Sequence, residues 1–275
     1  MSQSWVKGKR ATYLAFFLIA VVVILTVFIL RHPQYTAAIR GKKIAEQSGC
    51  FACHGPGGTG GVANPGSPDG QVPAWTGGTV MMYINSENEI KEWILDGLPQ
   101  RLRKNKTAKS DSNAASPEIS SEGKQGIQQP LITMPAFEKL LSDKQLLQLI
   151  AYFKVVSTYE SPSTDKVKNG YDVALKLGCF GCHGPGGRVG STNPNSFKGY
   201  IPPWEGKDFA ELVRDKEELK EWISEGKISR LESNPIAQYF TKGQIIQMKA
   251  YKNVLKEGEL DALVSYIEWL NKKNL

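Results

Sequence analysis

The sequence predicts an all-α protein with an N-terminal transmembrane helix followed by two similar helical domains. Three observations lead to this prediction: an uncharged apolar run of 20 residues near the N-terminus, a five-residue motif that occurs twice, and a wider repeat around that motif at an offset of 129 residues. We therefore divide the chain into a stub and anchor at 1–36, a first domain (lobe one) at 37–156, a linker at 157–168 and a second domain (lobe two) at 169–275.

A membrane anchor is predicted at residues 11–30, which read ATYLAFFLIAVVVILTVFIL. Twenty residues of helix match the hydrocarbon thickness of a bilayer. Basic residues flank the run on both sides, at Lys7, Lys9 and Arg10 before it and at Arg31 after it. A cleaved signal peptide is the alternative, but its apolar core usually has about 7–15 residues and a small-residue cleavage site follows it. We expect an uncleaved anchor in contact with the lipid bilayer.

The repeated motif uses all four cysteines and two of the three histidines of the chain. Its copies read CFACH and CFGCH, and their reactive side chains are Cys50, Cys53, His54, Cys179, Cys182 and His183. Two thiols at this spacing can each form a thioether with one vinyl group of a haem, and the adjacent imidazole can bind the iron. The pattern predicts two covalently bound c-type haems, with His54 and His183 as iron ligands.

Three other kinds of site also use paired cysteines. A thioredoxin-like redox dithiol does not need a histidine after the second cysteine in both copies. A zinc site that pools both pairs usually has its C-x-x-C motifs closer together in the sequence. Structural disulfides are the third alternative to haem attachment.

The repeat extends well beyond the motif and indicates a duplicated domain. At an offset of 129 the matching pairs include Gly41 and Gly170, Asn64 and Asn193, Pro73 and Pro202, Trp75 and Trp204, Trp93 and Trp222, and Arg101 and Arg230. The lobes differ after Leu102, where lobe one carries a longer stretch rich in Ser, Lys, Asn and Gly at about 104–129. This composition predicts a surface loop, which either docks a partner or has no role of its own.

Both lobes continue with a methionine and then a helical pattern. In lobe one the pattern covers 138–155, with Ser142 and Gln145 placed as a capping box and apolar residues at Leu146, Leu149, Ile150 and Phe153. In lobe two the same spacing occurs at Leu260, Leu263, Val264 and Ile267. We expect both segments to be amphipathic helices that pack on a core.

Met134 and Met248 stand at corresponding places just before these helices. Methionine is a common second ligand of haem iron, and Met81 and Met82 have no methionine at the repeat offset, so the matched pair is predicted to bind the two irons. The alternative is that each methionine only fills the core. The third histidine, His32, lies two residues beyond the anchor, where an interfacial side chain is favoured over a spare iron ligand.

In combination, C-x-x-C-H, then P-x-[LW]-x-G, then M-P-x-F before a C-terminal helix resemble the class I cytochrome c family, twice in tandem over about residues 37–275. The resemblance implies a small all-α fold around each haem and a proline carbonyl that accepts the histidine N–H, at Pro73 and Pro202. Trp75 and Trp204 stand where the family often has leucine. They are expected to be core aromatics against the haem, with an electron conduit as the alternative.

The resemblance also implies the location of the lobes, because covalent haem attachment takes place outside the cytoplasmic membrane. We expect a single-pass protein of the cytoplasmic membrane with its N-terminus in the cytoplasm and both lobes on the periplasmic side. The formal charge of +7 falls to roughly +3 once four haem propionates are counted, so nucleic acid is a poor candidate partner.

The expected function is single-electron transfer without an enzymatic reaction of the chain's own. The expected partners are subunits of a membrane redox complex, such as a quinol–cytochrome c reductase or an oxidase, and soluble or membrane-bound electron donor and acceptor proteins. The main alternative is a dihaem peroxidase-like enzyme, which would need one iron with an open position. A sensor is a third possibility, although no signalling domain is evident.

Overall fold

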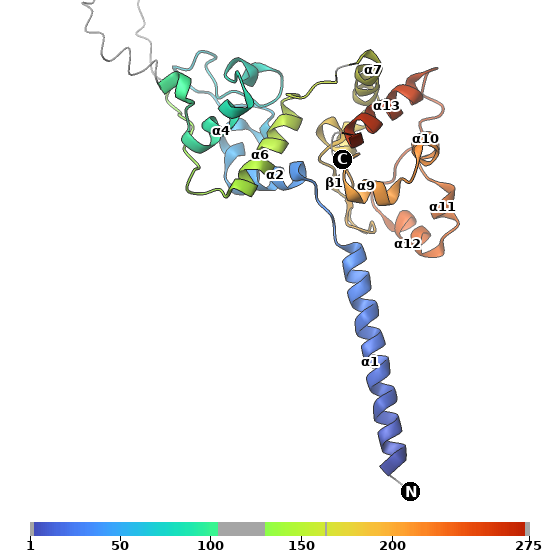
Figure 1. The fold of residues 1–275 in the computed structure, drawn as a ribbon. Coiled ribbons are helices and arrows are strands. Elements are labelled where there is room, and N and C mark those ends of the chain that lie inside the picture. The colour runs from blue at the N-terminus through green and yellow to red at the C-terminus, as the bar shows by residue number, and fades with distance from the viewer. Residues whose placement is uncertain (1–2, 104–129, 163, 273–275) are drawn as a thin grey trace, which may run out of the picture.

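The computed structural model describes residues 3–103, 130–162 and 164–272, so the surface loop predicted at 104–129 lies outside the described residues. A long helix, α1, leads away from two lobes that lie side by side (Figure 1). Across the described ranges the only sheet is a hairpin of two short strands, β1 (Ser191–Thr192) and β2 (Tyr200–Ile201). The all-α prediction is therefore confirmed.

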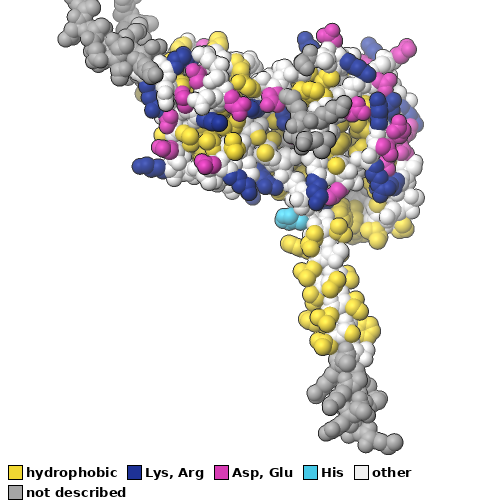
Figure 2. All heavy atoms as spheres, viewed as in Figure 1, with side chains coloured by type: hydrophobic (Ala, Val, Ile, Leu, Met, Phe, Trp, Pro, Cys, Tyr) yellow, Lys and Arg dark blue, Asp and Glu magenta, His cyan; other side chains and the backbone are white. Residues whose placement is uncertain are grey.

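Helix α1 covers Gln3–Arg31. Its segment Thr12–Arg31 has a mean hydropathy of 3.1, none of it is buried within the chain, and by length and composition it is sufficient to cross a membrane. Figure 2 shows apolar side chains around the described part of this helix. The helix ends two residues before Pro33, as expected where proline disfavours helical geometry in the preceding residue.

Among the described residues, lobe one is built from helices and two short 3₁₀ turns. They are α2 (Ala37–Gln47), α3 (Cys50–His54), η1 (Pro56–Gly58), η2 (Thr79–Met82), α4 (Glu87–Asp96) and α6 (Asp143–Val156). Side-chain oxygens of Thr36, Ser86 and Ser142 cap α2, α4 and α6, and the predicted capping box of Ser142 with Gln145 is confirmed. Helix α6 begins at the residue after this cap and not at 138, because the chain forms a turn after Phe137.

Lobe two repeats this plan, with helix α9 at the place of η2. Its elements besides the hairpin are α7 (Asp165–Lys176), α8 (Phe180–His183), η3 (Pro185–Gly187), α9 (Lys207–Leu212), α10 (Lys216–Glu225), α11 (Ser229–Glu232), α12 (Pro235–Gly243) and α13 (Glu259–Lys272). Helix α7 starts inside the segment predicted as linker at 157–168, so the connection between the lobes is shorter than expected.

Each core forms where the first helix of a lobe crosses its last helix, α2 with α6 and α7 with α13. Gly41 and Gly170 lie at these crossings. A Cβ atom at Gly41 would come within 1.9 Å of the carbonyl oxygen of Gln148, and one at Gly170 within 2.1 Å of that of Ala262. The duplicated glycines therefore allow the close approach of helix backbones that closes each core.

The lobes contact each other through lobe two residues that follow η3. Val189 is buried in the core of lobe one. Beside it, Arg188 lies 3.8 Å from Glu160, a residue of the connecting segment that also lies 3.6 Å from Lys154 on α6. This apolar contact with its adjacent ion pairs holds the two lobes together in addition to the chain that links them.

An ion pair that occurs in both lobes joins the helix before the methionine to the turn that follows this helix. In lobe two, Arg230 donates to both oxygens of Glu218, at 2.6 and 2.9 Å, and these bonds lower the pKa of Glu218 from 4.5 to about 2. The unfolded chain takes up a proton between these pH values and the native chain does not. The stabilisation by Glu218 is therefore complete above pH 4.5 and is lost as the pH falls toward 2.

We expect Glu218→Gln to lower the free energy of unfolding at pH 7 by about 1 kcal/mol. Between pH 6 and pH 3 the free energy of unfolding of this variant should fall by less than that of the native protein. Denaturant titrations followed by circular dichroism at the two pH values measure both effects. Glu225→Gln is the matched control, because Glu225 pairs with Lys252 at a half-exposed position on the same helix. An equal acid sensitivity of Glu218→Gln and the native protein would contradict this assignment.

Candidate functional site

A pocket in lobe two brings together the residues that the motif analysis selected there. Its lining is mostly apolar and includes Cys179, Cys182, His183, Pro202, Trp204, Trp222 and Met248. These residues come from four separate parts of the lobe, from the start of α8 to the loop before α13. Two thiols, one imidazole and one thioether facing one apolar pocket form a donor set suited to covalent haem.

Both motif histidines are held in one orientation by a proline carbonyl. The Nδ1 atom of His54 lies 2.8 Å from the oxygen of Pro73, and that of His183 lies 3.1 Å from the oxygen of Pro202. When Nδ1–H donates to this carbonyl, Nε2 keeps its lone pair for a metal. The expected histidine–proline contacts are thus present, while the roles of these four residues at iron stay predictions.

Burial lowers the pKa of both imidazoles and outweighs the hydrogen bonds to the proline carbonyls, which raise it. For His183 the value falls to about 4. The two rings are therefore neutral near pH 7, which is the form that binds a metal.

The four cysteines are free thiols, with none in a disulfide. Burial raises the pKa of Cys50, and it raises that of Cys179 to about 11. A redox dithiol instead uses a thiolate, whose pKa its surroundings lower. Within the described ranges no three His, Cys, Asp or Glu side chains are grouped to hold a metal ion. The geometry therefore gives no support to the redox-dithiol or zinc readings of the motif.

Trp75 and Trp204 pack directly against the motif histidines. The ring centroids of His54 and Trp75 are 5.1 Å apart, and those of His183 and Trp204 are 4.9 Å apart. Both indoles are buried, and their backbone N–H groups donate to glycine carbonyls in η1 and η3. Each tryptophan thus supports the imidazole from the core side.

Met248 lines the pocket of lobe two, and Met134 packs against the core of lobe one. In each lobe a buried asparagine clamps the isoleucine two residues before the methionine. Asn193 donates to the carbonyl of Ile246 and accepts from its N–H, both at 2.9 Å. The pair in lobe one has the same two bonds, between Asn64 and Ile132, at 2.9 and 2.8 Å.

The other side of each methionine is held by the helix before it. Backbone N–H groups three residues after the methionine donate to Ile94 and Ile223, at 3.1 and 3.0 Å. Gly97 and Gly226 end these helices at φ of 71° and 70°. A Cβ atom there would lie 2.3 Å from the carbonyl oxygen of Met134 or 2.6 Å from that of Met248. Only glycine combines this left-handed geometry with the close approach.

Trp222 and its counterpart Trp93 differ in their hydrogen bonds. In lobe one Nε1 of Trp93 donates to the carbonyl of Tyr83 at 3.1 Å, whereas Nε1 of Trp222 is buried without an acceptor. An unpaired buried donor costs about 1–3 kcal/mol. Because Trp222 lines the pocket, an acceptor on the bound group, such as a haem propionate, would satisfy it. Both the apolar lining of the pocket and the unpaired N–H of Trp222 therefore fit a bound haem.

Sequence reasoning missed the roles of Asn64, Asn193 and Trp222, although the repeat register already paired the asparagines with each other and Trp222 with Trp93. His32 is exposed at the end of α1, where its ring centroid lies 6.0 Å from that of Phe28, and it is not among the residues that line the pocket. This position agrees with an interfacial histidine.

Comparison with protein families gives a match to the family model described as Cytochrome c, in two segments, residues 38–157 and 167–271. Each segment coincides closely with one lobe, and together they cover most of the chain. Neither the curated proteins nor the solved structures gave a match.

Proposed function

The chain belongs to the cytochrome c family, and from this premise we propose that it is a membrane-anchored dihaem electron carrier that works as a subunit of a respiratory redox complex. The observation that carries the proposal is the duplicated site. In both lobes a proline carbonyl orients the motif histidine and an asparagine clamp holds the methionine segment, in a chain that begins with a helix of membrane-spanning length.

Haem, when bound, supplies the iron that gains and loses one electron. The chain's own residues then have separate tasks. The cysteine pairs would hold the porphyrin covalently. His54 and His183 would each bind one iron, and Met134 and Met248 would each supply a second ligand. A methionine ligand raises the reduction potential relative to a second histidine, which suits a carrier in the upper part of a respiratory chain.

A histidine and a methionine for each iron would favour a carrier over the peroxidase-like alternative, which needs an open position at one iron. The anchor favours a subunit over a free shuttle, because a single span adds only tethering and contacts with neighbouring helices. A quinol–cytochrome c reductase or a terminal oxidase is the proposed setting. We place the lobes on the periplasmic side of the cytoplasmic membrane, as for other proteins with covalently attached haem.

The test is purification of the tagged full chain from solubilised membranes of its own organism. We expect two covalent haems per chain, complete reduction of both when quinol is added to the membranes, and co-purification of other redox subunits. Cys179→Ser with Cys182→Ser is the control and should leave one covalent haem. Rapid turnover of peroxide by the intact protein, or failure of quinol to reduce either haem, would contradict the proposal.

A further inference from the structure

Helix α12 presents an apolar face on which Ile236 and Tyr239 are exposed. None of its nine residues is buried, and the side chains of Ile236 and Tyr239 are 71% and 76% exposed. These two residues share one side of the helix with Phe240, at spacings of three and four. The opposite side is polar, and there Lys242 donates to Gln238 at 2.8 Å. The helix is therefore amphipathic, with its apolar side facing outward.

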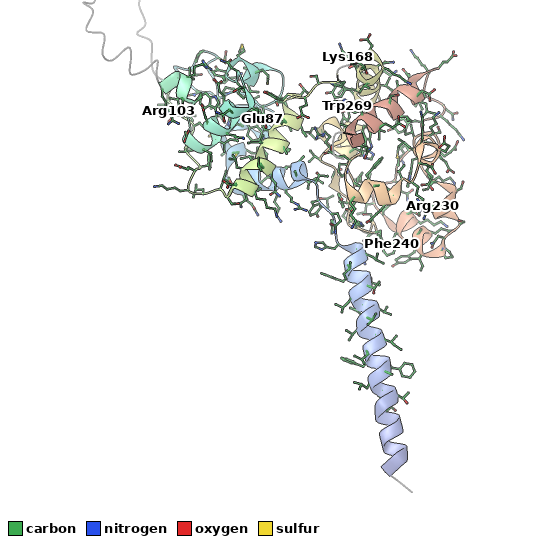
Figure 3. All side chains as sticks on the ribbon, in the orientation of Figure 1. Glu87, Arg103, Lys168, Arg230, Phe240 and Trp269 are labelled. Atoms are coloured by element: carbon green, nitrogen blue, oxygen red, sulfur yellow. The ribbon has the colours of Figure 1, made fainter. Side chains whose placement is uncertain are left out.

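The end of the membrane helix is joined directly to this surface. Arg31, the last residue of α1, has its guanidinium carbon 5.2 Å from the centroid of Phe240, and its Nε donates to the carbonyl oxygen of Phe197 at 3.0 Å. The rings of Phe197 and Phe240 lie 5.1 Å apart. Figure 3 shows Phe240 beside the end of α1, and Figure 2 shows apolar side chains where α1 meets lobe two.

A second contact three residues further along fixes the same junction. The backbone N–H of Gln34 donates to Asp208 at 2.8 Å, and Asp208 is itself held by Lys198 and by the hydroxyl of Tyr200, both at 2.5 Å. Nearby, the rings of Tyr35 and Tyr200 are in edge contact at 5.3 Å. Lobe two is thus attached at two points to the C-terminal end of α1 and the residues after it, and these contacts fix its position relative to this helix.

We propose that α12 lies in the headgroup region of the bilayer that α1 spans, with Ile236 and Tyr239 entering the boundary of the acyl chains. This inference rests on the proposed membrane anchor. An arginine at the end of a span lies at headgroup level, so the helix that contacts Arg31 lies there too. An exposed face of isoleucine and tyrosine with a lysine on the polar side is suited to that interface.

The contact gives lobe two a defined orientation on the membrane. Residues 244–247 lead from α12 straight to Met248, and Gln244, Ile246 and Gln247 line the pocket of lobe two. The interfacial helix therefore holds the methionine side of this pocket toward the membrane surface. Because the end of α1 contacts lobe two through Arg31, lobe two is the one positioned to exchange electrons with a redox group at the membrane surface.

The test places one fluorophore at a time on the full-length holoprotein in phosphatidylcholine vesicles. In the holoprotein the four native cysteines are occupied by thioethers, so a cysteine introduced by Ile236→Cys is the single labelling site. Quenching by lipids that carry a nitroxide near the headgroup is expressed relative to vesicles without nitroxide, which removes the effect of the haems. We expect at least twofold stronger quenching at position 236 than at Lys242→Cys on the polar side, about 120° away around the helix.

A third label, from Val22→Cys in the middle of α1, tests the anchor separately from the inference. Its quenching is measured with lipids that carry a nitroxide near the ends of their acyl chains. Strong quenching at position 22 together with equal, weak quenching at positions 236 and 242 would overturn the inference and leave the anchor standing. Weak quenching at position 22 would overturn both. If position 236 is accessible to aqueous iodide in these vesicles but protected in native membranes, a protein subunit covers α12 and the lipid assignment is wrong.

Discussion

Replacement of Met248 by alanine should lower the reduction potential of the haem in lobe two by on the order of 100 mV or more, because axial ligands set haem potentials over a range of about 0.8 V. The thioether that favours the reduced iron would be lost and water or no ligand would take its place. Met134→Ala should do the same in lobe one. Redox titration with optical detection resolves the two haems, and the spectrum of the Met-ligated oxidised iron should disappear from one lobe at a time.

Met82→Ala is the matched control, since Met82 lies near the site of lobe one in sequence but its side chain is 68% exposed. It should leave both potentials and both spectra unchanged. If Met248→Ala and Met134→Ala also left them unchanged, the two methionines would be core residues and the axial ligands would have to be sought elsewhere. A change in both haems from either single substitution would instead mean that the lobes are coupled through their interface.

Local patterns predicted the elements that depend on neighbouring residues in the sequence. The capping box at Ser142 and the apolar spacing from Leu146 to Phe153 determine α6 by themselves. The 20-residue apolar run was expected at 11–30, and the candidate span lies at Thr12–Arg31. In these cases the physical cause, a side-chain cap or an unbroken apolar surface, lies within one helix.

Contacts that form only on folding were not predicted. The asparagine clamps join residues 68 and 53 positions apart, and nothing near Asn64 or Asn193 in the sequence points to their isoleucine partners. Helix α12 was missed for a related reason. It lies in a stretch where the two lobes differ, so the repeat supplied no second copy against which to compare its pattern.

The duplicated contacts also show which parts of the lobe the site depends on. Histidine orientation, methionine placement and helix crossing recur in both copies, whereas the hydrogen bond of Trp93 has no equivalent at Trp222. The elements that hold the axial residues are thus common to both lobes, and the polar surroundings of the pocket are not. Because hydrogen bonding and burial tune haem potentials, two sites with one ligand set need not share one potential.

Asn193→Ala should loosen the segment that carries Met248. The substitution removes both bonds to Ile246 and leaves its partly buried backbone N–H and C=O without their partner, at a cost of about 1–2 kcal/mol in the stability of lobe two. Asn193 lines the pocket, but its side-chain hydrogen bonds go to Ile246 and Gln244 and not to His183 or Met248, so we expect it to act by positioning. We expect the Met-ligated spectrum of lobe two to be lost at a lower temperature than in the native protein, well before the helical circular dichroism changes.

Asn64→Ala is the matched variant, since Asn64 makes the same pair of bonds to Ile132, and it should affect the other haem alone. Asn193→Asp provides the finer control: a carboxylate can still accept from the N–H of Ile246 but cannot donate to its carbonyl, so its midpoint should fall between those of the native protein and Asn193→Ala. A purely structural asparagine would instead show the spectrum and the circular dichroism melting together. That outcome would mean that the asparagine does not position Met248 and that the contacts with Gly226 and Ile223 do so.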